Sequence, residues 1–160
     1  METLIERAAG LDVHQATVVA CVVIEQDGAK LKRETRTFET VRRGLEQLRE
    51  WLGSMSITHV AMEGTGVYWM PVYAVLEDYF DIALVNARHV KNVPGRKSDV
   101  LDCQWLQELH TFGLLRGSFR PEDEICVLRA YWRHRDNLIK ATSAHIQQMQ
   151  KALLQMNLQL

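Results

Sequence analysis

The first third of the chain combines apolar runs of strand length with one amphipathic segment. Residues 8–24 are rich in Val, Ile and Ala, and we expect a strand that starts at Gly10 and continues to Ile24. An Asp-Gly turn at residues 27–28 then predicts that residues 30–38 return as the second strand of a hairpin. Residues 40–53 place leucine and tryptophan at helical intervals and predict an amphipathic helix.

The middle of the chain continues this alternation. Residues 57–62 form a short apolar run that predicts a strand ending at Glu63, and residues 68–79 predict an aromatic-rich helix. Residues 81–86 predict another strand, and a charged loop is expected to follow it over residues 88–97. Strands that alternate with helices are typical of an α/β domain.

The stretch from Val93 to His110 contains a second helix signal with two acidic residues. A Pro-Gly pair breaks the backbone, and Ser98 can cap a helix that we expect to start at Asp99. Asp99 and Asp102 would then share one face of that helix. Acids in a first turn are also favoured by the helix dipole and often contact only water, so the pair by itself is weak evidence for a metal.

Residues 121–160 predict one long helix, because no Gly or further Pro follows Pro121. Steps of seven residues meet an apolar side chain each time, at Ile125, Trp132, Ile139, Ile146, Leu153 and Leu160. Arg135 and Thr142 interrupt the companion stripe. We expect residues 1–120 to form one domain and residues 121–160 to form a helical arm that pairs with a second chain. The apolar pattern of the helix runs to the last residue without a helix stop signal. We therefore expect this sequence to be part of a longer protein whose further domain is missing here.

Composition limits the kinds of partner and compartment. A formal net charge of −1 over 160 residues gives no overall attraction to nucleic acid or membrane, so any basic surface must be local. The segment 88–97 is the one dense cationic run, and it predicts contacts to a nucleic-acid backbone through Arg88, Lys91, Arg96 and Lys97. Three scattered cysteines, no signal peptide and no membrane-length apolar run favour a cytoplasmic protein that does not contact membranes.

Four carboxylates occupy positions from which they can converge in an α/β domain. Asp12 lies in an apolar strand, Glu63 lies where a strand ends, and Asp99 and Asp102 open a helix. For Asp12 the alternative is an acid at a bend or sheet margin. Clustered carboxylates suit Mg²⁺ or Mn²⁺, and two such ions can promote phosphodiester chemistry. The sequence therefore predicts a metal-dependent polynucleotidyl transferase.

Three stretches resemble the DEDD transposases of insertion sequences, a family related to pilin-gene invertases that includes bridge-RNA-guided recombinases. They are GLDVH at residues 10–14, MEGTGVYW at 62–69 and GRKSDVLDCQWLQEL at 95–109. LLRGSFRP at residues 114–121 is similar to the stretch that precedes the family's long helix.

This resemblance implies a RuvC-like, ribonuclease-H-type α/β fold with a mixed central sheet, followed by a long coiled-coil-forming helix. It also implies that DNA is the substrate, that a guide (bridge) RNA is a potential partner, and that the chain forms a homo-oligomer through its helix. The metal-binding tetrad implied by position is Asp12, Glu63, Asp99 and Asp102. The family's nucleophilic serine belongs to a C-terminal domain, and no serine of this sequence matches its motif.

Two other functions stay open at this point. One is a junction resolvase or other free-standing nuclease with the same fold, which would cut branched DNA without a further domain. The other is a nucleic-acid-binding or dimerisation module in which the acids are inert and the long helix is the working part. A measurement of metal binding distinguishes the two enzyme hypotheses from the hypothesis of a non-catalytic module.

Overall fold

The computed structural model of the chain describes residues 3–26, 30–64, 66–93 and 101–158. The chain divides into two compact units, Met1–Phe119 and Arg120–Leu160. The strands of the first unit are β1 (Ala8–Val13), β2 (Thr17–Gln26), β3 (Lys30–Glu39), β4 (His59–Glu63) and β5 (Asp81–Val85). Its helices are α1 (Arg42–Ser54), α2 (Trp69–Leu76), α3 (Ala87–Asn92) and α4 (Asp102–Thr111).

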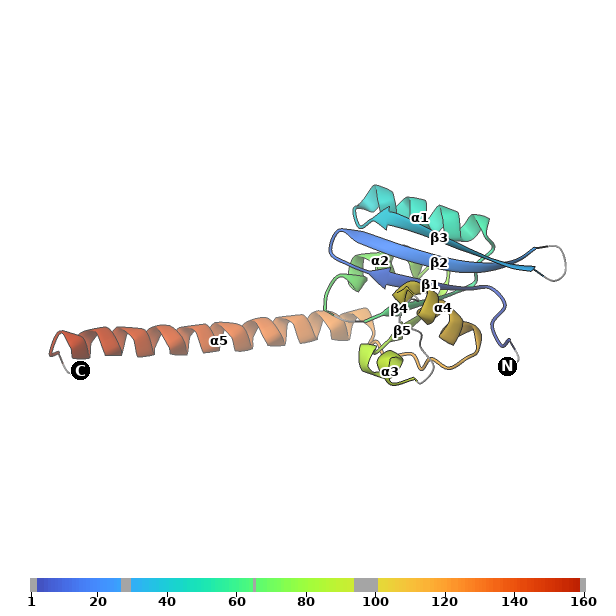
Figure 1. Ribbon diagram of the computed structural model, residues 1–160. Helices are drawn as coiled ribbons and strands as arrows, with labels where there is room; N and C mark the ends of the chain where they lie inside the picture. Colours follow the sequence, from blue (N-terminus) through green and yellow to red (C-terminus); the bar gives the residue numbers. More distant parts are fainter. Residues whose placement is uncertain (1–2, 27–29, 65, 94–100, 159–160) are drawn as a thin grey trace. The chain divides into compact units, whose positions relative to one another are not determined.

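The strands form one mixed sheet in the order β3-β2-β1-β4-β5 (Figure 1). β1, β2 and β3 are neighbours in antiparallel pairs, whereas β1, β4 and β5 run parallel to one another. The α/β class with a mixed central sheet is therefore as predicted.

Alternate residues of each strand point to opposite faces of the sheet, and the two faces have different cover. On one face, Ala9 and Leu11 of β1 join the main hydrophobic core together with α1 and α2. The buried residues of these two helices include Leu45, Leu48, Leu52, Val72 and Leu76. On the other face, α4 packs on β1, and its Trp105, Leu106 and Leu109 form a second core with Val85 and Val90.

The break between β1 and β2 corrects the prediction of one strand over residues 10–24. The chain reverses between Val13 and Thr17, and the amide of His14 donates to the carbonyl of Thr17 over 2.9 Å. The polar residues His14 and Gln15 fit the turn, while pairing of the two halves buries the apolar residues on both sides. The remaining strands and the helices α1 and α2 occur within a few residues of their predicted bounds.

Two predictions for the segment after β5 are wrong. Residues 88–97 were expected to form a loop, but α3 occupies Ala87–Asn92, and the Asn86 side chain caps it by accepting the Arg88 amide at 2.9 Å. The next helix starts at Asp102 and not at Asp99, because Leu101 has extended backbone angles of φ −60° and ψ 147°. Its N-cap residue is Leu101, and both Ser98 and Asp99 lie outside the described residues.

The far end of α4 is fixed beside the start of the sheet. The carbonyl of Thr111 accepts from the amides of Leu4 and Ile5, which lie just before β1. The buried His110 ring lies 6.1 Å from the ring of His59 on β4. Burial, and secondly the nearby His59, lower the pKa of His110, so we expect a neutral ring at this end of α4 at neutral pH. α4 therefore runs from the carboxyl ends of β1 and β4 to their amino ends.

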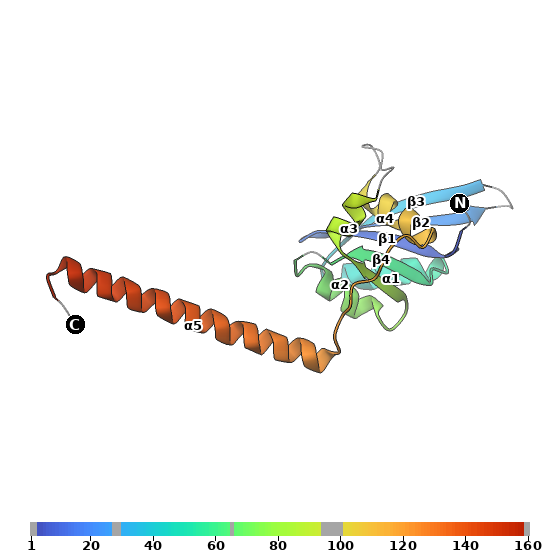
Figure 2. The same cartoon turned by 90° about the horizontal axis from the view of Figure 1, so that it is seen from below.

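The second unit contains α5 (Asp123–Gln155), a single helix of 33 residues (Figure 2). It begins two residues after Pro121, and it ends within the described part with Asn157 at φ 59°. The amide of Leu158 donates to the carbonyl of Leu153, which closes a Schellman-type cap. The sequence contained this stop signal in Asn157, and the expected absence of one is wrong. No helix in the described ranges combines the length and apolarity that crossing a bilayer requires.

Candidate acidic site at the carboxyl ends of the parallel strands

Asp12 and Glu63 lie on neighbouring parallel strands at the same edge of the sheet. The register pairs Leu11 with Met62, so the next residue on each strand is an acid. Leu11 and Met62 point into the main core, and both acids therefore point to the face that carries α4. Neighbouring strands are about 4.8 Å apart, which places the two carboxylates within reach of one cation.

Gly10 allows α4 to approach this edge. A Cβ atom at Gly10 would lie 2.1 Å from the carbonyl oxygen of Cys103 and 2.4 Å from the amide nitrogen of Gln107, both in the backbone of α4. Only glycine leaves room for such contact between a strand and a helix backbone. Because Asp102 directly precedes Cys103 and is the first residue of α4, this packing carries Asp102 to the edge that holds Asp12.

The charges of these acids act on one another. Burial is the largest cause of a raised pKa at Asp12, and the carboxylates of Asp102 and Glu63 raise it further. His14 acts in the opposite direction, because its Nε2 lies 3.1 Å from Oδ2 of Asp12. The Asp12 side chain is 24% exposed. Asp12 and Glu63 are thus partly buried and Asp102 is exposed, and burial together with the neighbouring acids opposes the ionisation of Asp12.

Oxygen donors that repel one another fit a hard divalent cation such as Mg²⁺. Within the described ranges, no group of three or more His, Cys, Asp or Glu side chains is already arranged to hold a metal ion. The structure brings Asp12, Glu63 and Asp102 into electrostatic contact, and the fourth predicted ligand, Asp99, lies outside the described residues. The four-ligand metal site stays a prediction.

The predicted cationic residues are described only in part. Arg88 is exposed on α3, directly after β5 and so near the same carboxyl edge of the sheet. Lys91 belongs to α3, whereas Arg96 and Lys97 lie outside the described residues. Sequence reasoning did not assign His14 to this site. A histidine two residues after the strand acid was the available signal.

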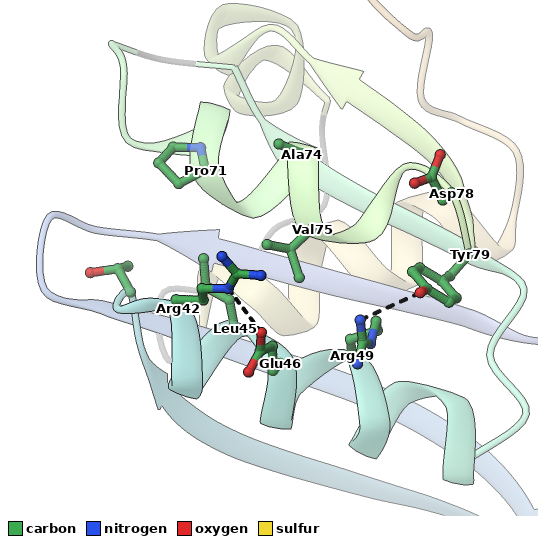
Figure 3. A pocket seen from close by; sticks show the side chains of 10 residues that line it. Arg42, Leu45, Glu46, Arg49, Pro71, Ala74, Val75, Asp78 and Tyr79 are labelled. Carbon is green, nitrogen blue, oxygen red and sulfur yellow. Dashed lines mark hydrogen bonds and ion pairs between the residues drawn. The ribbon is translucent and has the colours of Figure 1, made fainter.

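A separate groove of about 420 Å³ lies between α1 and α2 (Figure 3). Its two arginines already have partners, since Arg42 Nε lies 3.0 Å from Glu46 and the Arg49 guanidinium lies 4.9 Å from the centre of the Tyr79 ring. Because α1 and α2 pack on the face opposite α4, this groove is on the other side of the sheet from Asp12. It adds nothing to the acidic site.

The match to a family model agrees with the motifs. A family model described as a transposase, the IS110-type DEDD transposase, matches residues 9–158. Among solved structures, the RuvC structure of Thermus thermophilus is similar at 15% identity and a TM-score of 0.48, over 69% of this chain and 99% of that one. No curated protein matches the chain.

Proposed function

The chain belongs to the IS110-type DEDD transposase family, and from this premise we propose that its first unit acts on DNA phosphodiesters through a carboxylate site for Mg²⁺ or Mn²⁺. One observation carries the proposal: Asp12, Glu63 and Asp102 come from three separate elements, and their charges meet at one edge of the sheet. The family resemblance adds Asp99 as a fourth ligand.

Several described residues would hold such an ion, each from a different part of the fold. Asp12 and Glu63 supply oxygen ligands from rigid, adjacent strands, and Asp102 supplies another from the first turn of α4, where the helix dipole favours a negative charge. His14 contacts Asp12 and holds the orientation of its carboxylate. When bound, a divalent cation in such a site polarises a phosphoryl oxygen and activates water or another oxygen nucleophile.

Calorimetric titration with MnCl₂ tests this site. We expect the unchanged chain to bind Mn²⁺, and we expect Glu63→Gln to weaken binding at least about tenfold, because one charged ligand is replaced by a neutral amide. Glu50→Gln is the matched control, since Glu50 is exposed on α1 over the opposite face of the sheet. Equal Mn²⁺ affinity in the unchanged chain and Glu63→Gln would contradict the proposed role of Glu63.

The partner that we propose for this site is DNA, contacted through the cationic residues that follow β5. Exposed Arg88 lies near the carboxyl edge of the sheet, and Lys91, Arg96 and Lys97 come next along the chain. Arginine and lysine supply the phosphate contacts that position a protein on nucleic acid. A guide RNA presents the same phosphates, so these residues would serve both ligands.

We also propose that α5 joins two copies of the chain. Four residues of its apolar stripe are each 45% or more exposed, although each would be stabilised by burial: Ile125, Trp132, Ile139 and Ile146. Leu153 continues the stripe, and Leu160 lies outside the described residues. Burying one such side chain is worth roughly 1.5–3 kcal/mol, so pairing of two stripes would be favourable.

Light scattering measures this association directly. We expect the double change Ile139→Asp with Ile146→Asp to reduce the mass in solution to that of one chain, since four buried charges per pair cannot be accommodated. The control is Asn137→Asp with Gln147→Asp, which adds the same charge to α5 away from the stripe. A folded double variant that keeps the parent mass would show that the stripe is not the interface.

A further inference from the structure

The segment after α4 returns along the sheet and brings another arginine to the acidic edge. Gly117 forms an antiparallel bridge with Val85, and the amide of Ser118 donates to the carbonyl of Leu84 over 2.6 Å. This pairing sets Arg116 beside the carboxyl end of β5. Because Val85 is also the register partner of Glu63, Gly117 is two strand spacings, or about 10 Å, from Glu63.

Arg116 lines a small cavity of about 200 Å³ on the face that carries α4. The cavity is lined by Val85, His89, Val93, Leu114, Leu115 and Arg116. Val85, Val93 and Leu115 belong to the second core or pack against it, so the apolar part of the cavity is held in place. Among the described residues of the lining, the two polar side chains are a guanidinium and an imidazole, and none is a carboxylate.

The electrostatic setting of Arg116 differs from that of several other arginines. Arg36 and Arg42 have carboxylate partners at 2.8 and 3.0 Å, whereas the ion pairs found among the described residues include neither Arg116 nor Arg88. A guanidinium offers a planar fork of donors that matches a phosphate, and it keeps its charge at any working pH. A cation near these acids that has no carboxylate partner among the described residues is suited to an anionic ligand.

We propose that Arg116 and His89 bind a backbone phosphate of DNA on one side of the phosphodiester that the acidic site engages. This inference rests on the proposed function, which supplies the DNA. The backbone at Gly117, next to Arg116, lies about 10 Å from Glu63, which is roughly the axial rise of three nucleotides in one strand. Arg116 thereby extends the predicted cationic surface of Arg88 to a segment more than twenty residues later in the chain.

Binding of a 30-base-pair DNA duplex, followed by fluorescence anisotropy in EDTA over a range of salt concentrations, tests this assignment. We expect Arg116→Ala to weaken binding about five- to tenfold at 0.1 M salt and to lower the slope of log K against log salt by about 0.9, the value for one lost phosphate contact. Arg116→Lys should keep the slope, because the charge is retained. His89→Ala should weaken binding in the same direction.

Arg43→Ala is the matched control, because Arg43 is an exposed arginine on α1, over the opposite face of the sheet. Equal melting temperatures would show that the variants are folded. An unchanged slope in Arg116→Ala, or the same loss in Arg43→Ala, would overturn the phosphate pocket alone, since EDTA removes any contribution of metal. Absence of DNA binding by the unchanged chain would overturn both the pocket and the proposed function.

Discussion

Gly10→Ala is expected to destabilise the first unit by about 2–3 kcal/mol and to lower its melting temperature by roughly 6–12 °C. The added methyl group would lie 2.1 Å from one backbone atom of α4 and 2.4 Å from another. Neither atom belongs to a flexible side chain, so α4 itself must move away from β1. Differential scanning calorimetry measures the loss of stability.

The same change is expected to weaken Mn²⁺ binding at least about tenfold, because Asp102 moves with α4 while Asp12 and Glu63 stay on their strands. A misplacement of about 1 Å is enough to reduce catalysis about 100-fold in a preorganised site.

Gly53→Ala supplies the control for this prediction. Gly53 lies in the last turn of α1, and an added Cβ would meet no atom within 4 Å. Alanine is preferred over glycine in a helix, so this variant should be equally stable or up to about 1 kcal/mol more stable. If Gly10→Ala melted like the unchanged chain and bound Mn²⁺ equally well, the close approach of α4 would not determine the site.

Most strands and helices of the first unit could be predicted because their signals are local. The alternation in residues 30–38 and the helical spacing in residues 40–53 depend only on which residues face the core. The break between β1 and β2 at His14 could not be predicted from such local patterns, because the residues on both sides of it are strongly apolar. It becomes stable only when β1 and β2 pair with each other. The start of α4 at Asp102 likewise accompanies the packing of that helix on Gly10.

The acidic site shows the same division between local and non-local information. The sequence placed Asp12 and Glu63 on strands, and the family motifs implied that they meet, but no local pattern gives the strand order that makes them neighbours. Arg116 lies outside the dense cationic run of residues 88–97. Its place at the edge follows from a bridge between residues 85 and 117, which no periodicity within either segment reveals.

Asp12→Asn is expected to have opposite effects on stability with and without metal. Burial and the charges of Asp102 and Glu63 raise the pKa of Asp12, so its carboxyl group favours folding while protonated. That contribution is complete below the ordinary value of 3.8 and is lost as the pH rises through the higher pKa of the folded state. At pH 7.5 in EDTA the ionised group opposes folding, and the neutral amide should stabilise the chain by about 1 kcal/mol.

With Mn²⁺ we expect the unchanged chain to be more stable than Asp12→Asn, the reverse of their order in EDTA. A ligand that binds only the folded state stabilises it by about 2.7 kcal/mol at 100 times its Kd, and Asp12→Asn should lose most of this gain together with a charged ligand. Thermal melts of both proteins in EDTA and in MnCl₂ measure the reversal.

Asp81→Asn is the control, because Asp81 starts β5 at the amino ends of the parallel strands, where it pairs with His59. An equal rise in melting temperature for the unchanged chain and Asp12→Asn would mean that Asp12 is not a ligand. The acids at this edge would then not form the site that we propose.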